Sequence, residues 1–153
     1  MRQRVMMAAI LVTALFAGRT AARAADAAAV PAEKPADLAA TLETVLKQNF
    51  AASEQKDVKG VMATLHTNSP VAAVTAEALT SLFETFELKY ELLSFRLVGR
   101  DGEYAVARAE QKTTKVKGPD FKDNVIDSLY IFRTQDGKWR LWYQVLLETR
   151  LAK

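Results

Sequence analysis

The sequence predicts an α+β domain in which three helices precede four antiparallel strands. Apolar residues between positions 37 and 86 recur at helical spacing, and from Leu88 onward the pattern changes to β-rich runs separated by short turns. The clearest signal lies in residues 124–150, where two such runs flank Asp136 and Gly137, a dipeptide typical of tight hairpin turns because both residues tolerate positive φ. Helices and strands that are segregated along the chain indicate the α+β class.

Each predicted helix has a candidate N-cap and one apolar face. Asp37, Asp57 and Thr75 are the expected caps, since a short polar side chain can accept a hydrogen bond from the first turn. The apolar faces are Leu38, Leu42, Val45, Leu46 and Phe50 in the first helix, Val58, Val61, Met62 and Leu65 in the second, and Leu79, Leu82, Phe83 and Phe86 in the third.

The four strands are expected at residues 89–98, 103–116, 124–134 and 139–150. Two registers fit the last hairpin. A two-residue turn pairs Arg133 with Arg140 and Tyr130 with Tyr143, whereas a glycine bulge shifts each pair by one residue. Repulsion between two facing arginines favours the bulge, but the sequence leaves both registers open.

The N-terminus has the three parts of a secretory signal peptide. Arg2 and Arg4 precede an apolar run at residues 5–18, and Ala22-Arg23-Ala24 is a small-x-small cleavage pattern. The run is shorter than the roughly 20 residues of a membrane-spanning helix, so we expect no transmembrane segment. We therefore expect a signal peptide at 1–24, a flexible Ala/Pro linker at 25–36, a domain at 37–153, and a protein that is exported to the periplasm or secreted.

Removal of residues 1–24 on export would change the net charge of the protein from +3 to −1. Residues 1–24 contain four Arg and no acid, so the mature chain keeps 17 basic and 18 acidic residues and a net charge of −1. A nucleic-acid partner is not expected, because such domains usually keep a basic face. The chain has no Cys and one His, which excludes disulfides, thiol chemistry and Cys- or His-rich metal sites, and its acids lack EF-hand spacing. We expect neither a metal nor a cofactor.

Two stretches of the chain resemble the NTF2-like superfamily, which includes SnoaL-like and ketosteroid-isomerase-like proteins. Residues 50–66 (FAASEQKDVKGVMATLH) resemble the end of its first helix, an acidic break and a short second helix. Residues 132–141 (FRTQDGKWRL) resemble its penultimate strand, turn and last strand. The resemblance covers about residues 37–151. It implies a curved sheet wrapped around the long helix, a conical pocket, and homodimers packed through the sheet.

The candidate site residues divide into two groups. His66 and Asp127 are the candidate acid–base residues, although a His here more often caps its helix or lies in a turn, and an Asp in a strand is more often paired with Arg or Lys. The candidate ligand-binding residues have apolar bodies and polar tips, and could instead be sheet core or dimer interface. They are Tyr90, Tyr130, Trp142, Tyr143 and Gln144.

These features favour a non-catalytic domain that binds a small apolar or amphipathic ligand, or a partner protein, in its conical pocket. Some catalytic relatives carry a His or an acid in the last strand, where this chain has Tyr143, Gln144 and Val145. The alternatives are an isomerase- or dehydratase-type enzyme that uses Asp127 or His66, and a homodimeric interaction module with a filled pocket. Five basic residues on or near the second strand predict a Lys-guarded sheet edge, with an anionic ligand or membrane surface as the alternative. They are Arg108, Lys112, Lys115, Lys117 and Lys122.

Overall fold

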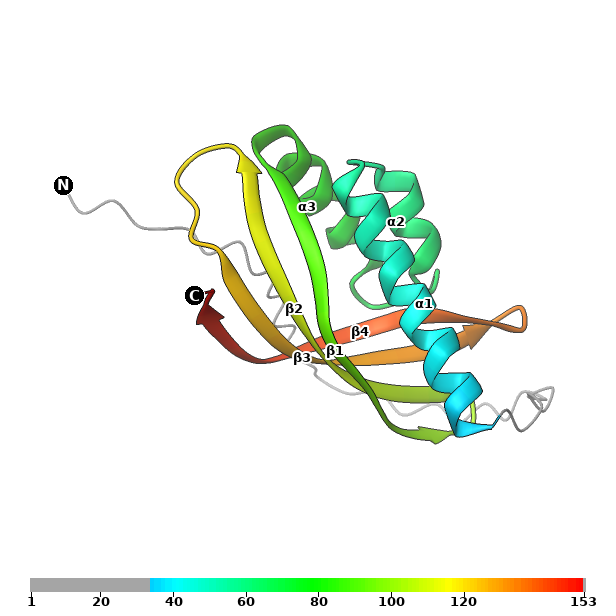
Figure 1. The fold of residues 1–153 in the computed structure, drawn as a ribbon. Coiled ribbons are helices and arrows are strands. Elements are labelled where there is room, and N and C mark those ends of the chain that lie inside the picture. Colours follow the sequence, from blue (N-terminus) through cyan, green and yellow to red (C-terminus); the bar gives the residue numbers. More distant parts are fainter. Residues whose placement is uncertain (1–33, 153) are drawn as a thin grey trace, which may run out of the picture.

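The computed structural model describes residues 34–152 as three helices followed by a curved four-stranded sheet (Figure 1). The helices lie together on one side of the sheet (Figure 1). This arrangement confirms the predicted α+β class and element order. The elements are α1 (Pro35–Glu54), α2 (Val58–Thr64), α3 (Ala72–Thr85), β1 (Glu87–Asp101), β2 (Tyr104–Lys117), β3 (Asn124–Gln135) and β4 (Lys138–Leu151). The predicted signal peptide and most of the predicted linker lie outside the described residues.

Two of the three predicted helix starts are wrong. α1 begins at Pro35, two residues before the predicted cap Asp37, because Pro needs no hydrogen-bond partner in a first turn and has a helical φ. Residues 35 and 36 thus belong to α1 and not to the linker. α3 begins at Ala72 instead of after Thr75. The turn before it is closed by Ser69, whose Oγ accepts a hydrogen bond from the Val71 backbone N–H at 3.3 Å.

The start of α2 is as predicted. The Asp57 carboxylate accepts a hydrogen bond from the Gly60 backbone N–H at 2.9 Å, which satisfies one of the unpaired donors of the first turn. After α2, the backbone N–H of His66 donates to the carbonyl of Leu141 at 2.8 Å, and Leu65 forms an isolated parallel bridge with Leu141. These contacts fasten the α2–α3 connection to β4.

The sheet is an antiparallel meander in the order β1-β2-β3-β4. β2 is therefore a central strand, and the predicted Lys-guarded edge at its basic residues is wrong. The true edges are β1 and β4, and both are irregular. Leu93 and Val98 are extra residues in β1, as Trp142 and Leu147 are in β4. Bulges of this kind twist an edge strand and make it a poor template for pairing with another chain.

The hairpin between β3 and β4 has the two-residue turn, so the glycine bulge is wrong at this position. Asp136 and Gly137 have φ of 51° and 71°, as a type I′ turn requires. Arg133 consequently faces Arg140. The repulsion is offset because Arg133 donates to Glu103 at 2.9 Å, while the Arg140 guanidinium donates to the backbone carbonyl of Ala63.

The two-residue register does not extend along the whole hairpin. The extra residue Trp142 in β4 shifts the pairing, so that Tyr130 faces Gln144 instead of Tyr143. Neither predicted register gives this pair. The shift matters for function, because it brings the polar ends of Tyr130 and Gln144 together.

The main core lies between α1 and the helix-facing side of the sheet. α1 contributes Leu38, Leu42, Leu46 and Phe50, as its periodicity predicts, and Leu42 and Leu46 are fully buried. β2 presents only small residues to this core, namely Ala105, Ala107 and Ala109, so the helix can approach the sheet closely. A second cluster of Val61, Leu79 and Phe83 joins α2 to α3.

Candidate functional site

A cavity of about 200 Å³ lies between the helices and the helix-facing side of the sheet. Its walls combine aliphatic and aromatic side chains with hydroxyl and amide groups. They are formed by Asn49, Phe50, Ser53, Val61, Leu65, Val71, Thr75, Leu79, Leu82, Tyr90, Gln111, Tyr130, Leu141, Trp142, Tyr143 and Gln144. Among the described residues, no Asp, Glu, His, Lys or Arg lines the cavity.

All five predicted ligand-binding residues lie in the walls of this one cavity. Sequence reasoning missed the other eleven, most of which come from the helices. The wall from α3 had a readable signal, since Thr75, Leu79 and Leu82 follow each other at helical spacing and so share one face. Gln111 carried no comparable signal, because its polar neighbours in β2 face the other side of the sheet.

A hydrogen-bonded network crosses the sheet wall of the cavity. The Tyr130 hydroxyl donates to Gln111 Oε1 at 3.1 Å and accepts from Gln144 Nε2 at 3.3 Å. Gln144 Nε2 also donates to Ser128 Oγ at 3.0 Å, and Gln111 Nε2 donates to Thr113 Oγ1 at 3.1 Å. Tyr130 is almost fully buried, and burial raises the pKa of its hydroxyl above the ordinary value. The network is therefore a fixed, uncharged surface at neutral pH.

Tyr90 forms a second wall of the cavity. Its ring stacks on Phe50 with a centroid distance of 5.8 Å and an interplanar angle of 28°. Burial and, secondarily, the negative charge of Glu54 raise the pKa of Tyr90 to about 12, so the hydroxyl stays protonated. Within residues 34–152 this hydroxyl has no hydrogen-bond partner, unlike that of Tyr130. It is a donor that remains available at the cavity wall.

Trp142 contributes to the cavity differently from the other predicted residues. Its ring packs edge-on against His66 at 4.9 Å, and the guanidinium of Arg133 lies 4.8 Å from its centroid. Its backbone carbonyl accepts a hydrogen bond from Ser69 Oγ at 2.7 Å. The Trp142 ring is thus packed between protein groups, and the residue fixes the loop that follows α2.

His66 does not line the cavity. The residue is buried, its Nδ1 accepts a hydrogen bond from the Asn68 backbone N–H at 3.1 Å, and its ring meets Trp142. Burial and the nearby positive charge of Arg133 lower the pKa of its imidazole. The structure therefore assigns His66 to the turn after α2, and not to an acid–base site in the cavity.

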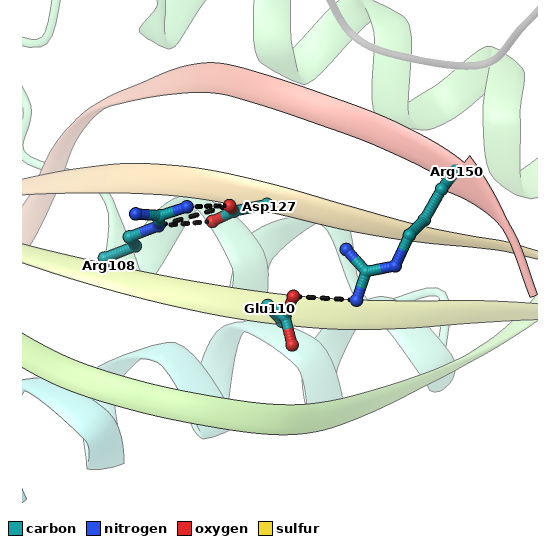
Figure 2. A network of polar contacts seen from close by, with 4 residues as sticks. All are labelled: Arg108, Glu110, Asp127 and Arg150. Carbon is teal, nitrogen blue, oxygen red and sulfur yellow. Dashed lines mark hydrogen bonds and ion pairs between the residues drawn. The ribbon is translucent and has the colours of Figure 1, made fainter.

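Asp127 lies on the opposite side of the sheet, which we call the outer face. Its cross-strand partner in β2 is Glu110, whereas the next residue, Ser128, pairs with the core residue Ala109. Arg108 Nε donates to both Asp127 oxygens at 2.9 and 3.1 Å, and the Arg108 guanidinium makes a further contact with the same carboxylate (Figure 2).

This ion pair removes Asp127 from the list of acid–base residues. Hydrogen bonds from Arg108 hold the pKa of the Asp127 carboxyl below its ordinary value, so it stays ionised. Beside the pair, Arg150 donates to Glu110 at 2.7 Å (Figure 2). The expectation that an Asp in this strand is paired with Arg or Lys is confirmed. The alternative of a pocket acid is wrong, because Asp127 has the opposite strand parity to Ser128 and Tyr130.

The described residues 34–152 contain neither a group of potential metal ligands nor a membrane-spanning helix. No group of three or more His, Cys, Asp or Glu residues there is placed to hold a metal ion. No helix of residues 34–152 is long and apolar enough to cross a membrane.

One comparison with known proteins gives a family match, and another gives none. The family model for the C-terminal domain of the anti-sigma-I factor RsgI9 matches residues 44–151. A comparison with curated proteins finds no match.

Many solved structures share the fold at low sequence identity. A suspected aromatic ring hydroxylase from Novosphingobium aromaticivorans has a TM-score of 0.66 at 14% identity, over 78% of this chain and 96% of its own. A suspected dehydratase of the NTF2-like family from Streptomyces avermitilis has a TM-score of 0.57 at 13% identity (72% and 95%). A ketosteroid isomerase-like protein from Erwinia carotovora atroseptica has a TM-score of 0.54 at 21% identity (69% and 92%). These likenesses confirm the NTF2-like fold.

Proposed function

The chain belongs to the family defined by the C-terminal domain of the anti-sigma-I factor RsgI9, and we propose that it binds a small, largely apolar molecule in the cavity between its helices and its sheet. The observation that carries this proposal is the composition of the cavity wall, which combines mostly apolar side chains with a few fixed hydroxyl and amide groups. Sites for small molecules commonly combine these two features.

The size of the cavity limits the ligand. At about 200 Å³ the cavity is smaller than the roughly 300–1,000 Å³ of sites for drug-sized molecules. An apolar cavity of roughly 150 Å³ accepts benzene. The proposed ligand is therefore about as large as one substituted ring or a short branched chain.

We propose that binding is not followed by acid–base catalysis. The solved structures that share the fold include a suspected dehydratase and a ketosteroid isomerase-like protein. The main alternative to our proposal is therefore an enzyme. General acid–base chemistry needs a side chain that can exchange a proton near neutral pH within reach of the substrate. Among the described residues, the ionisable side chains of the wall are all tyrosines, and burial raises the pKa values of Tyr90 and Tyr130 further from neutrality.

The proposal is tested by filling the cavity from α3. Thr75→Phe adds a ring at the wall, whereas Thr80→Phe makes the same change on the exposed side of the same helix. We expect toluene, as a ring-sized probe, to shift NMR signals of the wild type and of Thr80→Phe saturably, and to have little effect on Thr75→Phe. Equal toluene binding by all three proteins, or by none, would contradict a ligand-binding cavity.

Export is a separate proposal that rests on the N-terminal sequence. We propose that the chain is cleaved near Ala24 and acts in the periplasm or outside the cell. Mass spectrometry of the exported protein should give a mature N-terminus close to residue 25. Recovery of exported protein that still begins at Met1 would contradict cleavage.

A homodimer packed through the sheet is also proposed. The outer face carries aliphatic residues on three strands, namely Val106, Leu129, Ile131 and Val145, beside the two ion pairs of Figure 2. Val145→Arg places a charge at a partly exposed position of this face, and Ala40→Arg is the control on the exposed side of α1. Sedimentation should show a dimer for wild type and control and a monomer for Val145→Arg. A monomeric wild type would contradict the proposal.

A further inference from the structure

Besides the size and polarity of the ligand, the cavity wall indicates its charge, its shape and its hydrogen-bonding groups. Three features of the described residues bear on it, namely the charges around the cavity, the flat aromatic pair at one side, and the hydrogen-bonding groups that are still available. The inference drawn from them rests on the proposed ligand-binding function.

The charges exclude an ionic ligand. A buried ion is costly unless an opposite charge or several hydrogen bonds replace its hydration. No charged side chain of residues 34–152 lines the cavity. Three arginines of β2, β3 and β4 already have partners. Arg133 is bound to Glu103, Arg140 to the Ala63 carbonyl, and Arg108 to Asp127. None of them is free to neutralise an anion.

A negative ligand meets a further obstacle at Tyr90. The Glu54 carboxylate accepts a hydrogen bond from the Tyr90 backbone N–H at 2.7 Å, so a negative charge already lies beside this wall. Glu54 itself does not line the cavity, and it therefore offers no direct contact to a cation inside. A neutral molecule avoids both penalties.

The shape of one wall favours a planar group. Phe50 and Tyr90 lie nearly parallel, with their centroids 5.8 Å apart, and both border the cavity. Aromatic rings gain most from offset stacking or edge-to-face contact with other rings. A flat ring fits such a pair better than a branched aliphatic chain does.

The hydrogen-bonding groups of the wall that remain free indicate which polar substituent the ligand ring carries. The Tyr130 hydroxyl hydrogen is used by Gln111, and Gln144 Nε2 is used by Ser128 and Tyr130. The Tyr90 hydroxyl, without a partner in residues 34–152, is a donor that a ligand can meet beside the aromatic pair. An uncharged carbonyl oxygen is the matching acceptor.

We propose that the cavity binds one uncharged aromatic ring bearing a carbonyl-type acceptor, which receives a hydrogen bond from the Tyr90 hydroxyl. Benzamide is the simplest molecule with these properties. Benzoate and benzamidine have the same planar outline but carry a negative and a positive charge at neutral pH. Toluene has the ring without the acceptor.

The test is to measure the dissociation constants of these four probes by NMR titration of the full mature chain. For the wild type we expect benzamide to bind about tenfold or more tightly than either charged probe, which corresponds to about 1.4 kcal/mol. For Tyr90→Phe we expect benzamide binding to weaken roughly two- to tenfold and toluene binding to stay unchanged, because only one hydrogen bond is lost. Tyr104→Phe, outside the cavity, should match the wild type.

The outcomes separate the two proposals. Toluene binding together with equal affinities for benzamide and benzoate would overturn the inference about charge while leaving the ligand-binding function intact. An equal loss of toluene and benzamide affinity in Tyr90→Phe would overturn the role of its hydroxyl. Failure of all four probes to bind would overturn the proposed function itself, and the inference with it.

Discussion

Removing a single oxygen atom at Tyr130 tests the hydrogen-bonded wall of the cavity. Its hydroxyl connects β2 to β4, since it donates to Gln111 Oε1 and accepts from Gln144 Nε2. Tyr130→Phe keeps the ring and its packing but removes both bonds. The matched control is Tyr90→Phe, which deletes the hydroxyl that has no partner in the described part of the chain.

The size of the effect follows from what each partner loses. Gln111 is 8% exposed, so its oxygen is left buried without a donor, and such an atom costs about 1–3 kcal/mol. Gln144 keeps its bond to Ser128 at 3.0 Å, and its bond to Tyr130 is long at 3.3 Å, so its loss is small. We expect Tyr130→Phe to lower the free energy of unfolding by about 1–3 kcal/mol, and Tyr90→Phe to change it by less than about 0.5 kcal/mol.

Urea denaturation measures this difference directly. Trp139 is buried in the core, and its fluorescence should report unfolding. The variants should share the wild-type dependence of free energy on urea and differ only in midpoint. Equal midpoints for Tyr130→Phe and Tyr90→Phe would show that the network does not hold the sheet wall together.

Three further predictions concern the fold. Burial lowers the pKa of His66, so as the pH falls this side chain is protonated in the unfolded chain before it is protonated in the folded one. The free energy of unfolding should therefore decrease below about pH 6.5. Urea denaturation of His66→Gln at several pH values should show a smaller decrease. Phe132→Ala should cost about 3–5 kcal/mol because its side chain is fully buried, whereas Leu147→Ala, at an exposed bulge, should change the free energy of unfolding by less than about 1 kcal/mol. Gly118→Ala should lower the melting temperature, since φ is +126° and a Cβ there would lie 2.7 Å from Phe86, and an unchanged value would contradict this geometry.

The sequence was sufficient for the architecture because periodicity reports which face of a helix or strand is buried. Leu38, Leu42 and Leu46 recur at helical spacing and form the core of α1 as predicted. The strand order also followed, since short turns join strands that lie next to each other. The expectation for Asp57 held because a cap depends only on residues three positions away.

The site was less predictable because it depends on contacts between distant segments. Repulsion between Arg133 and Arg140 was a sound local argument, but Glu103, in the β1–β2 turn, binds Arg133 and offsets it. The bulge at Trp142 has no sequence signal, yet it sets the pairing of Tyr130 with Gln144. For Asp127 the sequence favoured a pair with Arg or Lys, as observed, but left a pocket position open, because a one-residue difference in parity decides between the cavity and the outer face.

The central claim is that the cavity admits a small ring-sized molecule, and an NMR titration of the methyl groups with toluene tests it most directly. Saturable shifts are expected at Leu79, Leu82 and Leu141, which line the cavity, and none at Val145 or Leu147, which are exposed elsewhere on the sheet. Shifts confined to Val145 and Leu147, or no saturable shift at any of the five, would contradict the account.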